Sequence, residues 1–131
     1  MNNITRIFFA CSILFLNSCN KDNQSDQEED AQQLSILINQ ILSLSESKSC
    51  DNSENWSYTS IGNKACGGPH AFIPYPTTIN VQDFLELVET HKIKEHEYNL
   101  KWNISSDCAT PTEPSGVNCI NGEPVLEYDV L

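Results

Sequence analysis

The sequence predicts a small α+β domain: two amphipathic helices with a short strand and a C-terminal β-hairpin, stapled by two disulfides. Three observations predict it. Apolar residues recur at helical spacing in two segments, the stretch WSYTSI alternates as a short strand does, and Asn121-Gly122 separates two strand-like runs. About a hundred residues, numbers 31–131, form this domain, which is enough for one hydrophobic core and too few for two.

The first helix is predicted over residues 27–45. Its apolar residues recur mostly at steps of three and four, which places them on one face of a helix. They are Leu34, Leu37, Ile38, Ile41, Leu42 and Leu44. We expect this face to be buried.

The second helix is predicted from Asn80 to about residue 99. Asn80 can cap its N-terminus, Asp83 occupies the position of a capping-box partner, and Ile79 and Phe84 stand at the positions of a hydrophobic staple. Its inward face is predicted to carry Phe84, Leu87, Val88, His91, Glu95, Tyr98 and Trp102.

The remaining segments are predicted to be strands and loops. Trp56–Ile61 is a strand, and residues 63–74 are rich in Gly and Pro and form a loop. Residues 117–120 and 125–128 form a hairpin, because Asn-Gly is the dipeptide best suited to a type I′ turn. Pro124 near the start of the second hairpin strand indicates an edge strand.

The first eighteen residues have the pattern of an export signal. Arg6 precedes an apolar run of about ten residues, which is too short to span a bilayer as a helix. Leu16-Asn17-Ser18-Cys19 resembles the lipobox of bacterial lipoproteins. The resemblance implies that Cys19 is lipidated, becomes the N-terminus after cleavage and is acylated there, for example with palmitate. The alternative is an ordinary secretory signal with an incidental cysteine.

The residues that follow Cys19 indicate a localisation signal and a spacer. Cys19-Asn20-Lys21-Asp22 resembles the start of many lipoproteins from Bacteroidota, and this implies a lipid anchor in the outer membrane. The anchor faces either the cell surface or the periplasm. Residues 20–30 are all polar or charged, and such a segment cannot bury enough apolar surface to become ordered. Residues 19–30 are therefore predicted to be a lipidated cysteine and a flexible acidic spacer.

The charge balance excludes one class of partner. The chain has 7 Lys plus Arg against 18 Asp plus Glu and a formal net charge of -11. Binding to nucleic acid needs basic residues that neutralise phosphates, so we expect no nucleic-acid partner. The expected contact with the membrane is through the N-terminal lipid, and a protein partner remains possible but unnamed.

Four cysteines remain after the signal and the lipid site: Cys50, Cys66, Cys108 and Cys119. An even number in a small exported domain predicts two disulfides. Three pairings are possible, and we favour Cys50 with Cys66 and Cys108 with Cys119 because each closes a short loop. A four-thiolate metal site is the alternative, but neither pair has the spacing of a zinc ribbon.

One further resemblance covers nearly all of the chain after the spacer. The blocks Cys66-Gly67-Gly68-Pro69 and Ser106-Asp107-Cys108-Ala109, together with Cys50, Cys119 and Asn121-Gly122, are similar to a group of small cysteine-rich secreted or lipid-anchored bacterial proteins. That group has no known activity. The resemblance therefore implies a disulfide framework and a stand-alone domain, and it implies no catalytic residue.

A catalytic interpretation would use Cys66 as a nucleophile and His70 as its base. Such a pair needs a free thiolate, which a disulfide-bonded Cys66 does not have. Gly67 and Gly68 allow positive φ and Pro69 fixes a turn, so the structural interpretation is simpler. We expect no catalytic residue and no enzyme.

Two segments carry residue types that could bind a metal ion. His91 and Glu95 lie four apart on the second helix with His96 beside them, but a third ligand is missing and a half-buried pair is the simpler interpretation. Residues 51–55 (DNSEN) do not continue as a calcium loop and are predicted to be a polar turn. No metal and no cofactor are predicted.

The stretch GGPHAFIPYP offers a candidate binding loop. A stapled loop presenting His70, Phe72, Ile73 and Tyr75 would be preorganised for a partner. The alternative, which we favour, is that the large apolar side chains fold inward to cover a small core. The expected function is a non-enzymatic, lipid-anchored binding or inhibitor-like domain. The alternative is an enzyme or metal-dependent protein that uses His91 and Glu95 or a free Cys66.

Overall fold

The computed structural model describes residues 21–129 of the chain, and side chains from residue 24 onward. Cys19 and the predicted signal lie outside the described residues. The elements are α1 Lys21–Ser45, η1 Ser53–Asn55, β1 Trp56–Ile61, β2 Ala71–Pro76, α2 Val81–Lys101, β3 Gly116–Ile120 and β4 Glu123–Glu127. The α+β class is therefore confirmed.

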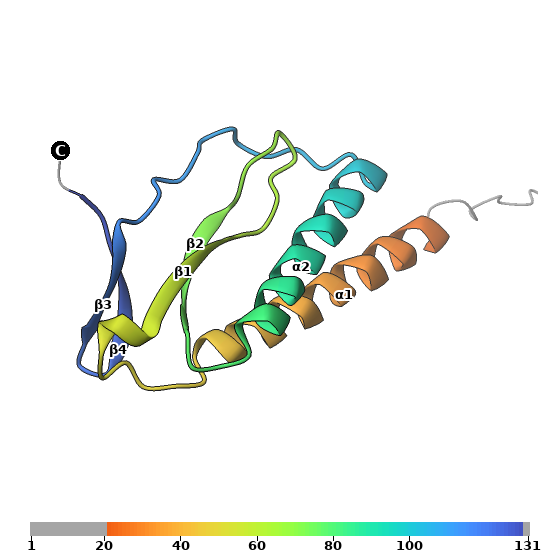
Figure 1. Cartoon of the computed structure of the whole chain (residues 1–131). Helices are drawn as coiled ribbons and strands as arrows, with labels where there is room; N and C mark the ends of the chain where they lie inside the picture. Colours follow the sequence, from red (N-terminus) through yellow and green to blue (C-terminus); the bar gives the residue numbers. More distant parts are fainter. Residues whose placement is uncertain (1–20, 130–131) are drawn as a thin grey trace, which may run out of the picture.

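Three layers build the domain (Figure 1). β1 pairs antiparallel with β2, and β3 pairs antiparallel with β4, so the strands form two separate two-stranded sheets. The antiparallel helices α1 and α2 lie on one side of the β1–β2 hairpin, and the β3–β4 hairpin lies on its other side. The first hairpin is consequently the middle layer.

The main core lies between the helices and the β1–β2 hairpin. Side chains on a strand alternate between two faces. Ile61, Ile73 and Tyr75 share the face toward the helices, where they meet Ile41 of α1 and Phe84 and Val88 of α2. The rings of Tyr75 and Phe84 lie 4.8 Å apart. On the opposite face, Trp56 and Pro76 are also buried.

α1 begins earlier than the sequence predicts. It starts at Lys21, so residues 21–30 of the predicted flexible spacer are helical. The reason is tertiary contact: Lys101 Nζ and Trp102 Nε1 both donate to Asp30 Oδ2, over 2.6 and 2.9 Å. Gln27 Nε2 donates to the hydroxyl of Tyr98 over 3.4 Å. The C-terminal end of α2 thus supports a segment whose composition alone does not favour order.

α2 forms as its start signals predict. The Asn80 side chain accepts from the backbone N–H of Asp83, and Phe84 in the next turn is completely buried. The helix continues to Lys101, about two residues beyond the predicted end. A side chain that satisfies an orphan N–H at an N-terminus contributes typically about 1 kcal/mol.

The turn regions divide into confirmed and corrected predictions. Asn121 and Gly122 have φ of 54° and 85°, which confirms the type I′ hairpin turn. The polar turn after Cys50 is also confirmed, as η1 with Asn52 as its cap. The predicted loop 63–74 is wrong at its end, because residues 71–74 belong to β2 and pair with β1.

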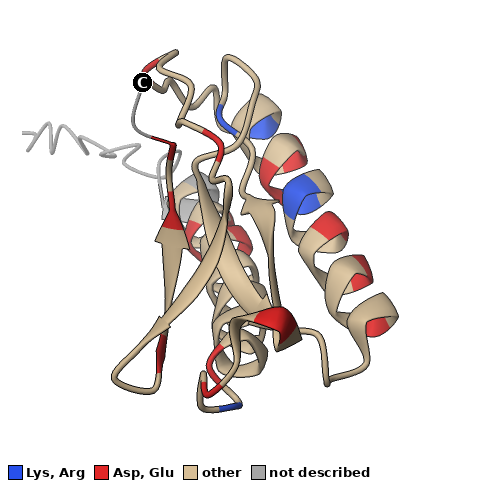
Figure 2. Cartoon of the chain, turned by 60° about the vertical axis from the view of Figure 1, so that its left-hand side comes forward, with Lys and Arg blue, Asp and Glu red and all other residues tan. Residues whose placement is uncertain are grey.

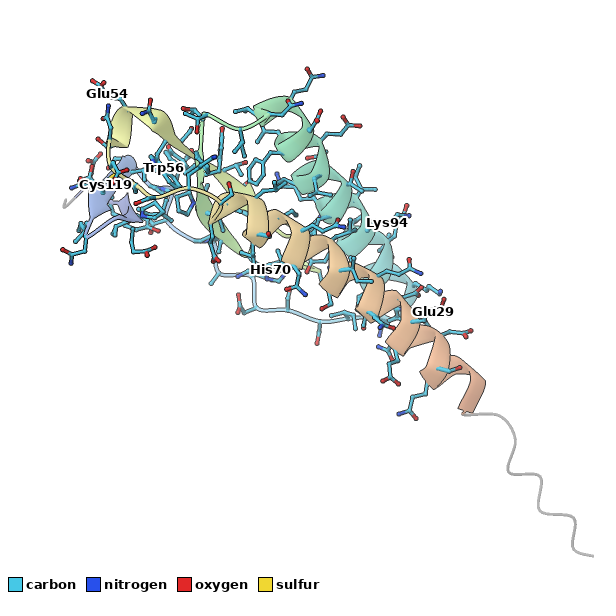
Figure 3. All side chains as sticks on the ribbon, turned by 90° about the horizontal axis from the view of Figure 1, so that it is seen from below. Glu29, Glu54, Trp56, His70, Lys94 and Cys119 are labelled. Atoms are coloured by element: carbon cyan, nitrogen blue, oxygen red, sulfur yellow. A yellow bond between two sulfur atoms is a disulfide. The ribbon has the colours of Figure 1, made fainter. Side chains whose placement is uncertain are left out.

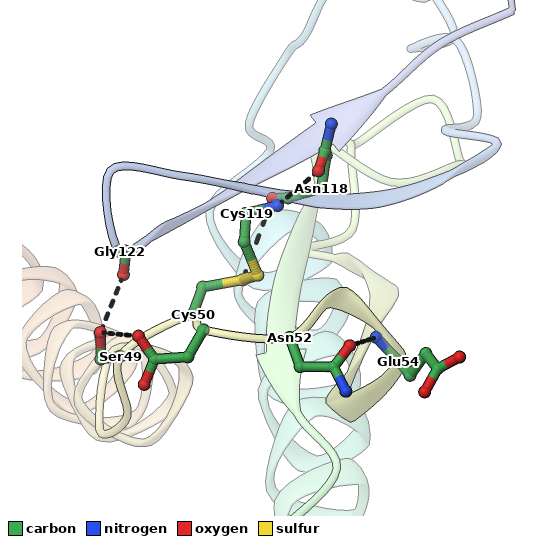
Figure 4. Close-up of a disulfide and its surroundings, with 8 residues drawn as sticks. Ser49, Cys50, Asn52, Glu54, Asn118, Cys119 and Gly122 are labelled. Carbon is green, nitrogen blue, oxygen red and sulfur yellow. Dashed lines mark hydrogen bonds between the residues drawn. A yellow bond between two sulfur atoms is a disulfide. The ribbon is translucent and has the colours of Figure 1, made fainter.

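The disulfide joins Cys50 to Cys119, so the predicted pairing of Cys50 with Cys66 and of Cys108 with Cys119 is wrong (Figure 4). The backbone N–H of Cys50 donates to the carbonyl oxygen of Gly122 over 2.8 Å, which brings the connector after α1 onto the second hairpin. Closing the short loop from Cys50 to Cys66 would cost only about 1 kcal/mol less entropy than closing the observed loop from Cys50 to Cys119. Tertiary packing outweighs this difference.

Candidate functional site

Glu95 on α2 fastens the loop between β1 and β2, residues 62–70. Glu95 Oε1 lies 3.2 Å from His70 Nε2, and the backbone N–H of Asn63 donates to Glu95 Oε2. Asn99 Nδ2 donates to the carbonyl oxygen of Asn63 over 2.7 Å. These contacts hold His70, a candidate binding residue, against α2, although its side chain remains 46% exposed.

Gly62 makes this close approach possible. Its φ is +79°, and a Cβ built on it would lie 2.4 Å from Cδ2 of His70. Any other residue would both strain the backbone and push His70 away from Glu95. Gly67 and Gly68 also have positive φ, as the sequence predicts.

His91 lies one helical turn before Glu95 and is 6% exposed. Burial lowers the pKa of His91; nearby Glu95 acts to raise that pKa and His70 to lower it. The ring belongs to a cavity of about 410 Å³. The lining residues are Ala31, Leu34, Ser35, Ile38, Ile61, Gly62, His70, His91 and Glu95.

The metal interpretation gains no support from this cluster. The cavity does bring His70, His91 and Glu95 to one place, which the sequence did not indicate for His70. Within residues 21–129, however, no three His, Cys, Asp or Glu side chains converge in the way that a metal ion needs. Glu95 is instead engaged with the β1–β2 loop.

Cys66 and Cys108 are free and exposed, and they lie beside each other. The thiol of Cys66 donates to the carbonyl oxygen of Asp107 over 3.1 Å and lies 3.5 Å from Ser106 Oγ. The neighbouring Cys108 thiol, more than any other group, lowers the pKa of Cys66, and the same contact raises the pKa of Cys108. His70 faces Glu95 and not Cys66, so the structure does not assemble the Cys66–His70 pair.

Lys64 secures the segment around Cys108. Its Nζ donates over 2.6 Å to Asp107 Oδ1 and over 2.6 Å to the carbonyl oxygen of Ala109. This ion pair lowers the pKa of Asp107. Lys64 is a buried basic residue, and the two acceptors satisfy the charge that burial would otherwise leave unpaired.

The other candidate binding residues are parts of β2. Tyr75 is buried, Ile73 packs against the main core, and the ring of Phe72 makes an edge contact with Tyr58 at 6.0 Å between centroids. The prediction that these side chains turn inward is confirmed for Ile73 and Tyr75. The stretch is thus a strand and not a presented loop.

A groove between α1 and α2 is the surface that the sequence analysis missed. It has a volume of about 480 Å³ and continues along α1 into a second, shallower hollow through the shared residue Ile36. Figure 3 shows the two helices side by side, with Lys94 on α2. The apolar residues along the groove are Leu34, Ile36, Leu37, Leu44 and Leu87.

Two of the groove residues are unusually exposed for large apolar side chains. Ile36 is 52% exposed and Leu44 is 38% exposed. Ile38, Ile41 and Ser45 follow the inward face of α1. The expectation that Leu42 and Leu44 share this buried face is wrong, because they are 36% and 38% exposed, and Ile36 also lies off that face. A sequence signal existed, because Ile36 does not fit the three- and four-residue steps of the buried face.

Charge is distributed unevenly around this groove. Residues 31–45 contain no Asp, Glu, Lys or Arg, although the chain has a net charge of -11. Charged residues are instead placed along α2, as Figure 2 shows, and in the first turns of α1. At one end of the groove, Lys101 pairs with Asp30.

Comparisons with known proteins give no match: no protein family, no curated protein and no solved structure is similar to this chain at a significant level. Neither helix within residues 21–129 combines the length and the apolar character that crossing a bilayer requires. The site is therefore interpreted from its own geometry and charge.

Proposed function

We propose that the chain is a lipid-anchored protein of the bacterial outer membrane that acts by binding, not by catalysis, and that it binds through the groove between α1 and α2. The observation that carries the proposal is an exposed apolar stripe on a charge-free stretch of helix in an acidic protein. Depletion of charge with exposed large apolar residues is typical of the core of a protein interface.

The anchor is proposed to be the acylated Cys19. Each methylene buried in a bilayer contributes about 0.8 kcal/mol, and two or more chains hold a protein stably. We expect Cys19→Ser to move the protein from the membrane fraction into the soluble fraction of the envelope. Cys11→Ser is the matched control, because Cys11 lies in the apolar run of the signal and should leave anchoring unchanged. Equal membrane retention of both variants would contradict the anchor.

The proposed occupant of the groove is an amphipathic helix of another envelope protein, with an uncharged apolar face and basic edges. The groove extends along α1 from Asp30 to Leu44, which is about 21 Å and matches a helix of about fourteen residues. The uncharged stretch of α1 suits the apolar face. Basic edges suit the acidic residues in the first turns of α1, whereas on the α2 side Glu97 lies between Lys94 and Lys101, and Lys101 already pairs with Asp30.

Burial of the stripe supplies a driving force. Completely burying an Ile or Leu side chain contributes roughly 1.5–3 kcal/mol, so a half-exposed one contributes roughly half of that. Ile36 and Leu44 are two such side chains in the groove, so the apolar face of the partner helix must bury a comparable area of its own for the complex to overcome the entropic cost of association.

A peptide titration tests the groove. The probe is a Leu/Lys amphipathic helical peptide of about fourteen residues, with a sequence-scrambled peptide and a Leu/Glu peptide of the same length for comparison. We expect saturable binding of the Leu/Lys helix alone. Ile36→Lys should weaken it at least tenfold, whereas Ile120→Lys should not, and the two residues are matched at 52% and 50% exposure. Equal effects of both variants would refute the groove.

A photo-crosslinking amino acid at Ile36 in intact cells distinguishes the occupants. The expected product joins this chain to a helix of a different envelope protein, and the same probe at Ile120 should not yield it. If the Ile36 product joins two copies of this chain, the groove is a self-association surface and the proposed partner is wrong. Sedimentation of the purified full chain provides an independent check of its oligomeric state.

The alternative function is an enzyme or metal-dependent protein that uses His91, Glu95 or a free Cys66. The contacts of these residues favour the binding proposal. Glu95 holds the β1–β2 loop, and His91 is buried by its helix and the cavity walls. Cys66 is the exception, because its exposed thiol is chemically available.

A further inference from the structure

Cys66 and Cys108 come from two irregular segments that the fold presses together. Cys66 lies at a tight turn in which the backbone N–H of Gly67 donates to the carbonyl oxygen of Lys64 over 2.8 Å. Cys108 lies in residues 102–115, which connect α2 to β3 without a helix or strand. Lys64 holds the two segments in register through Asp107 and Ala109.

We propose that Cys66 and Cys108 form a solvent-exposed thiol–disulfide exchange site, separate from the structural Cys50–Cys119 disulfide. Both thiols are exposed and adjacent, whereas Cys50 is 2% exposed. Two neighbouring thiols that external disulfides can reach are the requirement for exchange, because the reaction proceeds through a mixed disulfide at one of them.

The two cysteines have different roles in the exchange. Cys66 is the attacking group, because the neighbouring Cys108 thiol and Ser106 Oγ, 3.5 Å from Cys66 Sγ, can both donate to its thiolate and Lys64 adds a positive charge. These groups outweigh the Asp107 carbonyl oxygen, which accepts from the protonated thiol. Cys108 is the resolving group, since its own thiolate is disfavoured by the same neighbour and by Asp107. An asymmetric pair of this kind is typical of dithiols that react at a defined sulfur.

The oxidant is a disulfide, either a small molecule such as oxidised glutathione or the disulfide of an oxidoreductase. The Cys66 thiolate attacks one sulfur of that disulfide and releases the other as a thiolate. The Cys108 thiolate then attacks Cys66 Sγ, forms the Cys66–Cys108 bond and releases the second external thiolate. Two electrons pass to the oxidant, and the two protons lost by the cysteines go to solvent or to the released thiolates.

The bond would join the β1–β2 loop covalently to the α2–β3 connector. It would be nested inside the crosslink between Cys50 and Cys119, since residues 66 and 108 both lie between 50 and 119. In the reduced state Lys64, Ser106 and the Asp107 carbonyl hold the two segments together without a covalent bond.

Redox titration of the full chain in mild detergent tests the proposal. The protein is equilibrated with glutathione buffers of increasing reducing power, quenched with acid, alkylated and mapped by mass spectrometry. We expect a Cys66–Cys108 linked peptide in oxidised glutathione. The pair should open at a thiol-to-disulfide ratio at least about tenfold lower than the ratio that opens Cys50–Cys119.

Three outcomes would overturn the proposal. They are a pair that stays alkylatable in oxidised glutathione, a linkage of Cys66 to Cys50 or Cys119, and opening of both disulfides at one ratio. The result does not depend on the groove or on the lipid anchor, so its failure is distinguishable from failure of the proposed function.

Single variants test the assigned roles. Cys108→Ser replaces the Cys108 thiol with a hydroxyl donor and keeps Ser106 and Lys64 beside Cys66, whereas Cys66→Ser leaves Cys108 beside the Asp107 charge. The first variant should therefore form a mixed disulfide with oxidised glutathione several-fold faster than the second. An intact Cys50–Cys119 disulfide in both variants shows that each has folded. Equal rates, or a faster Cys108, would overturn the assignment of Cys66 as the attacking thiol.

Discussion

At the scale of single residues, the buried ring of His91 has a hydrogen-bonding nitrogen that is unsatisfied among the described residues. Its Nδ1 is a buried side-chain nitrogen that has no hydrogen-bond partner within residues 21–129. Burial disfavours the charged ring and lowers the pKa of His91, while Glu95 acts in the opposite direction and His70 in the same direction. The neutral ring is therefore the form that fits the folded domain.

This predicts a specific acid sensitivity. An unfolded His has a pKa of about 6.5, and the folded value is lower, so the unfolded chain binds the proton more readily. The stability that neutral His91 contributes is complete above about pH 6.5 and is lost as pH falls from there through the folded pKa. His91→Leu should flatten the fall in unfolding free energy between pH 7.5 and 5.5, measured by urea denaturation.

His96→Leu is the matched control for that measurement. His96 lies on the same helix at an exposed position, so its replacement leaves His91 and the wild-type slope in place. If both variants kept the wild-type slope, the titration of His91 would not be the cause of the acid sensitivity.

Glycine illustrates how far residue-level signals reach. The sequence indicates Gly67 and Gly68 as turn residues, and their positive φ confirms this. Gly62 was not singled out, because what it must avoid is His70 and Glu95, and the chain alone does not show that these approach it. The sequence indicates where a turn needs a glycine with positive φ. It does not indicate where a glycine is needed because a side chain from a distant part of the chain packs against it.

At the scale of elements, α1 has two apolar faces with different roles. Ile41 is fully buried against the main core, whereas Ile36 is 52% exposed along the groove. We predict that Ile41→Ala lowers the free energy of unfolding by about 2–4 kcal/mol and that Ile36→Ala changes it by less than about 0.5 kcal/mol. Chemical denaturation measures both.

The same two variants separate stability from binding. Ile36→Ala should weaken binding of the Leu/Lys helical peptide, although it leaves the fold intact. A large loss of stability for Ile36→Ala would show instead that Ile36 belongs to the core, and the groove would lose its main support.

Local periodicity predicted most elements well. The cap at Asn80 and the turn at Asn121-Gly122 are formed by neighbouring residues, so the signal is contained in the sequence that forms them. Trp56–Ile61 was predicted because its own residues alternate as a strand does, although it pairs with β2. The first turns of α1 and the strand Ala71–Pro76 were not predicted. Their order depends on partners far along the chain, such as Trp102 for Asp30 and β1 for β2.

At the scale of the whole molecule, the Cys50–Cys119 disulfide connects the outer hairpin to the end of the helical layer. It joins residues 69 positions apart. In the chain-entropy model, a crosslink of this span stabilises the folded state by about 4 kcal/mol. Cys50 reaches Cys119, past Cys66 and Cys108, because the β3–β4 hairpin packs on the β1–β2 hairpin. The spacing of the cysteines in the sequence does not reveal this packing.

We therefore predict that replacing both Cys50 and Cys119 with Ala lowers the free energy of unfolding by about 2–5 kcal/mol. Wild-type protein in excess strong reductant should lose a similar amount, which controls for the effect of the substitutions themselves. Urea denaturation of the two samples is the measurement. A loss below about 1 kcal/mol in both would mean that the layers hold together without the crosslink.

With the proposed lipid anchor at Cys19, the early start of α1 would affect how the domain stands on the bilayer. Lys21, its first residue, follows Cys19 by only two positions, so acyl chains on Cys19 would be joined almost directly to a rigid rod. Asp30, at one end of the groove, is about 14 Å along that rod. A protein mounted in this way has little lateral reach, and whatever it captures must itself lie within a few nanometres of the lipid headgroups.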